Sequence, residues 1–139
     1  MTAVDRLKSL RIVLAVAGVA CLALYPLMVF WPSGWAWHVG HSPYQMMIVG
    51  FYATLGVFLI LAARDPLASL SLIWFAVWSS VAHAGVMAVL AVTQPGQRGH
   101  LVGDVPALFI VAAALAILTP RSRSIEATHR SAASAIRGS

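Results

Sequence analysis

Charged side chains are scarce in this sequence. Only 9% of its 139 residues are Asp, Glu, Lys or Arg, whereas 60% are hydrophobic and the mean hydropathy is +0.86. A soluble domain of this size carries about 25% charged residues. The shortage excludes an ordinary water-soluble globule and indicates a lipid bilayer as the solvent, and the length allows a single domain.

Cysteine and buried carboxylates are nearly absent as well. Cys21 is the only cysteine, which excludes a disulfide within the chain. No carboxylate lies deep within an apolar run, which disfavours a proton-coupled multidrug exporter. Neither a phosphate-binding glycine loop nor a Gly-x-Ser-x-Gly elbow occurs, and no carboxylate is placed to orient His83 toward Ser79. We therefore expect a protein that is not an enzyme.

Basic residues outnumber acidic ones, with a net charge of +5. The arginines flank apolar runs and do not interleave with aromatics, so we predict no nucleic-acid partner. Eight of the nine basic residues fall on one side of the predicted spans and only Arg98 on the other. The positive-inside rule then places both termini in the cytoplasm of a bacterial inner membrane, with the chain as a multi-pass protein.

Four apolar runs are long enough to cross a hydrocarbon core of about 30 Å. The predicted spans cover residues 10–31, 43–64, 66–93 and 101–119. The fold class is therefore all-α, an integral membrane four-helix bundle over residues 1–120. Residues 121–139 are polar, serine-rich and basic, and are predicted to form a disordered cytoplasmic tail.

Turn residues mark where these helices start and bend. Ser42 stands directly before one proline and Asp65 before another, which predicts them as the N-caps of the second and third helices. Pro26 lies inside the first run and removes a backbone donor, so a bend near Leu22 is expected.

A polar cluster is predicted within the bundle. At about 100° and 1.5 Å per residue, Cys21, Tyr52 and His83 fall on inward faces and at one depth. The cluster consists of His83, Tyr52, Cys21, Ser79, Ser80, Gln45 and Tyr25. Two interpretations stay open: a hydrogen-bonded bridge between helices, or a site in which His83 ligates haem or a metal or faces a quinone-like ring.

The outer loops carry tryptophans and further polar groups. Trp31, Trp35 and Trp37 lie where the first span leaves the hydrocarbon, where they are expected to act as interfacial anchors. Two pairs three or four residues apart form a candidate outer-face site for zinc or copper: His38, His41, His100 and Asp104. Solvated interfacial side chains are the alternative.

Two stretches resemble a family of small uncharacterised four-span bacterial membrane proteins, a domain of unknown function. They are AARDP at residues 62–66 and IWFAVWSSVAHA at residues 73–84, within a likeness that covers mainly residues 44–90. The resemblance implies the four-span layout and no activity. Chain length and span number are also loosely similar to DoxX-like proteins.

Three functions follow as hypotheses. The first is a non-enzymatic membrane protein, either a homo-oligomer or an accessory subunit of a larger complex. The second is a redox-associated or cofactor-binding protein centred on His83, with quinone, haem or a metal as the alternatives. The third is a small-solute carrier, which requires a wet path through the bundle. The lipid bilayer is the one partner common to all three.

Overall fold

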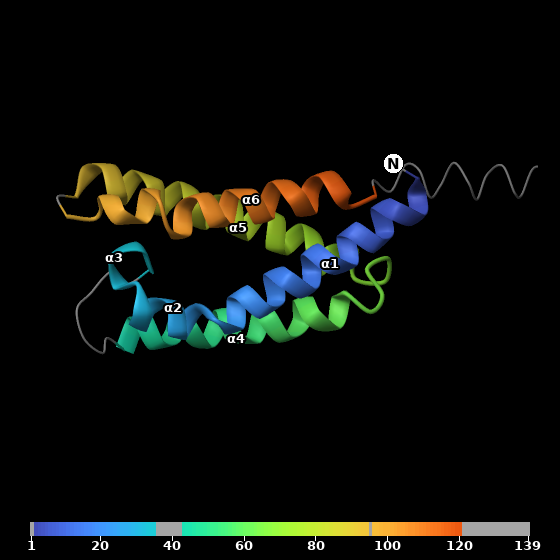
Figure 1. The fold of residues 1–139 in the computed structure, drawn as a ribbon, viewed down its shortest axis with the longest axis horizontal. Coiled ribbons are helices and arrows are strands. Elements are labelled where there is room, and N and C mark those ends of the chain that lie inside the picture. Colours follow the sequence, from blue (N-terminus) through green and yellow to red (C-terminus); the bar gives the residue numbers. More distant parts are fainter. Residues whose placement is uncertain (1, 36–42, 95, 121–139) are drawn as a thin grey trace, which may run out of the picture.

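The computed structural model describes residues 2–35, 43–94 and 96–120. Its elements are α1 (Ala3–Leu22), α2 (Leu24–Phe30), α3 (Pro32–Trp35), α4 (Pro43–Ala62), α5 (Leu70–Thr93), the short 3₁₀ helix η1 (Arg98–Leu101) and α6 (Asp104–Leu118) (Figure 1). This part of the chain contains no strand. The predicted all-α class is confirmed.

Three helical segments are long and apolar enough to cross a membrane: Pro43–Ala62, Leu70–Thr93 and Arg98–Leu118. The pair α1 and α2 passes the same test jointly and makes a fourth candidate when it is counted as one bent span. By length and composition the protein is therefore a multi-pass membrane protein with three to four spans.

The first span is bent by 53° between α1 and α2. The break falls at Ala23, because Pro26 has no N–H to donate to the carbonyl of Leu22, one turn earlier. This confirms the expected bend. Its consequence is that α2 leaves the direction of α1 and carries the chain toward α3 at one end of the bundle (Figure 1).

The helices are arranged as two antiparallel pairs. α1 packs along α4, and α5 packs along α6, while α1 also contacts α6. In Figure 1 the two pairs approach each other near the start of α1 and diverge toward the end that carries α3. The core that joins them is aliphatic, and its most deeply buried members are Leu10, Leu14, Leu59, Ile73 and Leu115.

The outer surface is apolar, as expected for contact with lipid tails. Large exposed hydrophobic side chains occur on every long helix, among them Val16, Phe58, Trp78, Val86, Ile110 and Ile117. Trp78 is 67% exposed, whereas Trp74 is partly buried and packs against the core. The bilayer is therefore the medium that covers these side chains.

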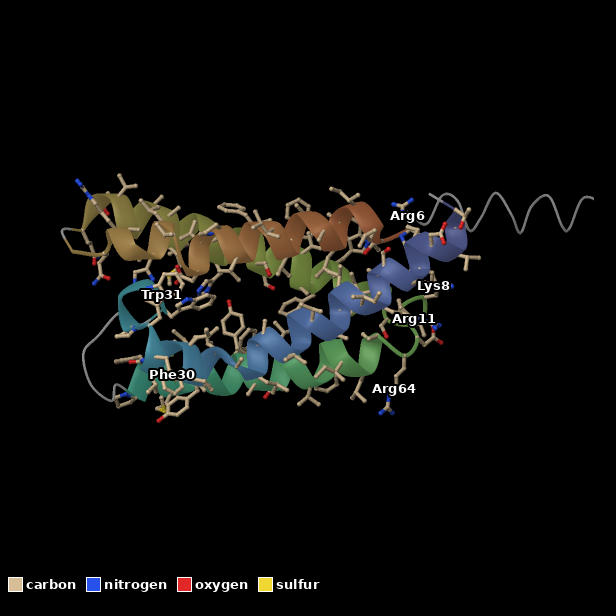
Figure 2. All side chains as sticks on the ribbon, viewed as in Figure 1. Arg6, Lys8, Arg11, Phe30, Trp31 and Arg64 are labelled. Atoms are coloured by element: carbon tan, nitrogen blue, oxygen red, sulfur yellow. The ribbon has the colours of Figure 1, made fainter. Side chains whose placement is uncertain are left out.

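The two ends of the bundle differ in charge. Arg6, Lys8, Arg11 and Arg64 lie at one end, and Phe30 and Trp31 lie at the other (Figure 2). The start of α1 and the end of α6 share the basic end (Figure 1). This arrangement is the one on which the topology prediction depends, and the cytoplasmic placement of that end stays a prediction.

The third helix begins later than the sequence indicated. α5 starts at Leu70 and not at Pro66, and the intervening residues form turns. Asp65 does accept a hydrogen bond, from the backbone N–H of Ala68 at 3.2 Å, but this bond closes a turn that precedes the helix. Ser42, His38, His41 and the predicted tail at 121–139 lie outside the described residues.

Arg6 links the two ends of the described chain. Its guanidinium donates to the carbonyl oxygens of Leu118 at 3.1 Å and Thr119 at 3.4 Å, and also to that of Ile117. The last carbonyls of a helix have no partner within the helix, and a cation favours that negative end. Arg6 thus caps α6 from α1.

We expect Arg6→Ala to lower the free energy of unfolding by about 1–2 kcal/mol, because the charged hydrogen bonds to α6 are lost. The measurement is unfolding by SDS in mixed micelles, followed by circular dichroism. Arg11→Ala, at an exposed position five residues further along α1, is the control and should change stability by less than about 0.5 kcal/mol. Equal effects of the two variants would show that only net charge matters.

Candidate functional site: a cavity between the helix pairs

A cavity of about 470 Å³ lies where the two helix pairs diverge. It is bounded by α1, α2 and α4 on one side and by α5 and α6 on the other, and α3 contributes Trp35. Most of its wall is aliphatic, including Leu24, Leu55, Leu59, Leu108 and Val111. Below its floor, toward the basic end, lie the packed side chains of Leu10 and Leu14.

The predicted polar cluster lies largely on this wall, at its middle level. Cys21, Tyr52, Ser80 and His83 come from three helices and all line the cavity. The rings of Tyr52 and His83 meet edge to face, with centroids 5.7 Å apart and planes at 84°. Aromatic pairs in this geometry attract each other, so α4 and α5 are joined here by a ring contact.

Two members of the cluster lie elsewhere. Tyr25 is 42% exposed and absent from the cavity wall, because the helix break at Ala23 changes the rotation that had placed it in line with Cys21. Ser79 donates to the carbonyl of Ala76 at 3.3 Å and lines a smaller hollow beside Tyr52 and His83. The seventh, Gln45, lines the cavity near its mouth.

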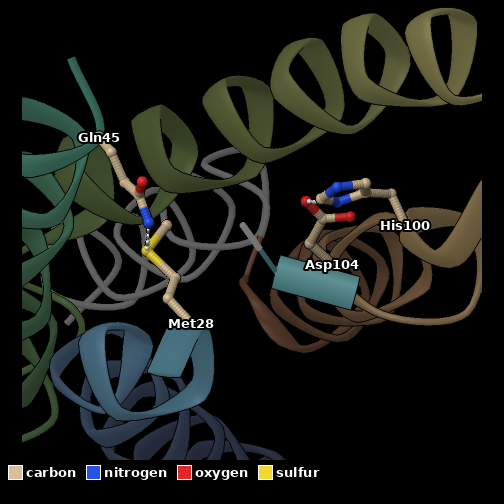
Figure 3. A network of polar contacts seen from close by, with 4 residues as sticks. All are labelled: Met28, Gln45, His100 and Asp104. Carbon is tan, nitrogen blue, oxygen red and sulfur yellow. Dashed lines mark hydrogen bonds and ion pairs between the residues drawn. The ribbon is translucent and has the colours of Figure 1, made fainter. Parts of the chain in front are cut away.

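The mouth of the cavity holds three buried polar atoms that lack a hydrogen-bond partner in the part of the chain that the structure describes. They are Nε1 of Trp35, Oε1 of Gln45 and Oδ1 of Asp104. The amide nitrogen of Gln45 donates to the sulfur of Met28 at 3.4 Å (Figure 3). Buried polar groups are normally paired, so three unpaired atoms at one mouth suggest an interaction with a group outside the described residues.

Asp104 is held by His100. Nδ1 of His100 lies 3.0 Å from Oδ2 of Asp104, and the two side chains are 1% and 9% exposed (Figure 3). The 3₁₀ helix η1 supplies His100, and Asp104 is the first residue of α6, where the helix dipole favours a carboxylate. The imidazole thus contacts one carboxylate oxygen, and Asp104 as a residue lines the cavity.

The sequence predicts Asp104 and His100 in a solvated loop or an outer metal site. The structure buries both, and no group of three His, Cys, Asp or Glu able to hold a metal occurs within residues 2–35, 43–94 and 96–120. Since His38 and His41 lie outside these ranges, the four-ligand site stays a prediction. The sequence does carry a signal for this buried pair, because His100 and Asp104 stand four residues apart at the start of a very apolar helix.

Comparison with known proteins gives one match. Residues 4–136 match a family described as a family of unknown function, DUF6632. The chain belongs to DUF6632. No curated protein and no solved structure matches it.

The DUF6632 match covers every helix described above and adds no activity. It agrees with the resemblance to a domain of unknown function over residues 44–90 and extends it along the chain. It gives no support to the looser likeness to DoxX-like proteins. For this DUF6632 member, the cavity is therefore the feature that bears on function.

Proposed function

We propose that the protein is a non-enzymatic protein of the bacterial inner membrane, with both termini in the cytoplasm, that holds an apolar small molecule between its helix pairs. The observation that carries this proposal is the cavity of about 470 Å³. Ligand sites typically measure about 300–1,000 Å³ and have apolar walls with a few polar groups that fix orientation. This cavity combines aliphatic walls with polar groups at two levels, near Tyr52 and near Asp104.

Among the cofactor alternatives, a ring or chain with a polar head suits the cavity better than haem. A haem with two histidine ligands needs a second imidazole facing His83, and His83 is the one histidine of the described residues on the wall. A polar group of the ligand can instead meet Tyr52, Ser80 and His83 at the middle level, or the polar side chains near Asp104 at the mouth. The ligand therefore enters with its apolar body along the aliphatic wall.

Binding is favoured over transport of a solute through the bundle. A carrier needs a wet path, and below the cavity the described residues fill the space between α1, α4, α5 and α6 with aliphatic side chains. A bound molecule suits an accessory subunit, which would present or store it for a neighbouring protein. The apolar outer surface leaves room for such a neighbour or for a second copy of the chain.

We expect the protein purified gently from its own membranes to retain a stoichiometric small molecule, detected by mass spectrometry of an organic extract. Ala107 lines the cavity, so Ala107→Phe should fill the space and reduce occupancy at least about tenfold. Ala113→Phe is the matched control, because Ala113 lies exposed on the same helix, and it should leave occupancy unchanged. Retention of nothing, or equal occupancy in both variants, would refute the proposal.

A further inference from the structure

We infer that the cavity selects ligands with a protonated amine, which the carboxylate of Asp104 binds at the mouth. This inference rests on the proposed function of the cavity and names the class of its ligand. Nothing in the sequence had placed a carboxylate inside the bundle.

The charge of the wall favours a cation. Asp104 is the one charged side chain among the described residues that line the cavity, with no Lys or Arg beside it. His100 contacts the carboxylate through Nδ1, and only a protonated imidazole would cancel a negative charge on Asp104. In apolar surroundings an uncompensated carboxylate is unfavourable, and a cation placed against it removes that cost.

Two of the three unpaired atoms at the mouth are acceptors and so favour a ligand that donates. His100 occupies Oδ2 of Asp104, while Oδ1 is buried and unpaired within the described residues. Gln45, on the facing helix pair, also lines the cavity, and its Oε1 is a second buried acceptor without a partner among the described residues (Figure 3). An ammonium group offers several N–H donors to two such acceptors, whereas a carbonyl or ether offers none.

Aromatic rings add to the preference. Trp35, Tyr44 and Tyr52 all line the cavity, and their faces attract a cation. The aliphatic wall beyond them receives an apolar body. The ligand class is therefore a lipophilic primary amine, with the ammonium group at the mouth and the hydrocarbon toward Leu55 and Leu59.

The test compares three probes that share one hydrocarbon body: phenylbutylamine, phenylbutanol and phenylbutyl-trimethylammonium. Binding to the full chain in lipid nanodiscs is measured by titration calorimetry, with empty nanodiscs to subtract partitioning. We expect the amine to bind at least about tenfold more tightly than the alcohol, because its hydrogen bond is charged. The trimethylammonium probe carries charge without an N–H donor and should fall between them.

Two variants test whether the preference for the amine arises at Asp104. Asp104→Asn keeps the size of the side chain and removes its charge, so it should weaken the amine at least about tenfold and the alcohol by less than about twofold. Asp65→Asn removes a carboxylate at an exposed turn at the opposite end of α5 and should weaken neither. The comparison of probes on the unaltered protein decides the question even if Asp104→Asn does not fold.

The outcomes separate the two proposals. Equal affinity for amine and alcohol, both abolished by Ala107→Phe, would overturn the amine preference and support the apolar cavity as a binding site. Loss of amine binding in Asp65→Asn as large as in Asp104→Asn would also overturn it. Failure of all three probes to bind would overturn both the amine preference and the proposed function.

Discussion

Leucine in place of Gly18 is expected to force α1 away from α4 and to lower the free energy of unfolding by about 3 kcal/mol. A Cβ atom at this position would lie 2.7 Å from the backbone oxygen of Gly56 and 2.7 Å from Cγ1 of Ile60. The side chain of Ile60 can rotate, but the backbone oxygen cannot. The helices must therefore separate, which opens voids along the whole pair.

The matched control is Gly50→Leu. Gly50 lies exposed on α4, and a Cβ atom there meets no described atom within 4 Å. Glycine is a poor helix former, so this variant should be neutral or more stable by about 0.5–1 kcal/mol. Stability is again measured by SDS unfolding in mixed micelles. A Gly18→Leu protein as stable as Gly50→Leu would mean that α1 and α4 do not pack at this distance.

The expected effect is large because lipid supplies no hydrophobic force between apolar helices. Helices in a bilayer associate through close packing, and small residues permit the shortest approach. Gly18 and Gly56 meet across α1 and α4, with each glycine's position blocked by the other's backbone oxygen. The close packing of α1 against α4, which form one side of the cavity, thus depends on glycine at positions 18 and 56.

Much of this arrangement follows from helical periodicity alone. Rotation and rise place Cys21, Tyr52 and His83 at one level on three inward faces, and the structure brings all three to the cavity wall. That estimate works because an α-helix in lipid has little freedom to depart from regular geometry. It does not reveal whether the three side chains enclose packed atoms or a space.

The features that periodicity misses are those set by contacts between helices. The helix break at Ala23 rotates Tyr25 away from the helix face that carries Cys21. The turns before Leu70 make α5 begin four residues later than the sequence predicts. The divergence of the two helix pairs, which creates the cavity, depends on how their aliphatic side chains fit at the basic end. Asp104 shows why burial is hard to predict from sequence. An acidic residue at the start of a helix indicates a favourable interaction with the helix dipole whether or not the residue is buried.

Alanine in place of His100 is the second change with a large expected effect. It removes the partner of a carboxylate that is itself 6% exposed, so we expect stability to fall by about 3–5 kcal/mol. His83→Ala provides the comparison, since His83 is half buried and contacts the ring of Tyr52 rather than a carboxylate. Loss of that ring contact should cost only about 0.5–1.5 kcal/mol.

A double-mutant cycle shows whether the loss at His100 arises from its pairing with Asp104. With both residues changed to Ala, no buried carboxylate remains to be compensated, so the double variant should be more stable than the sum of the single losses predicts, by about 1–3 kcal/mol. Additive losses would mean that the imidazole and the carboxylate act independently. Coupling of the expected size would instead show that His100 and Asp104 act as a pair at the mouth of the cavity.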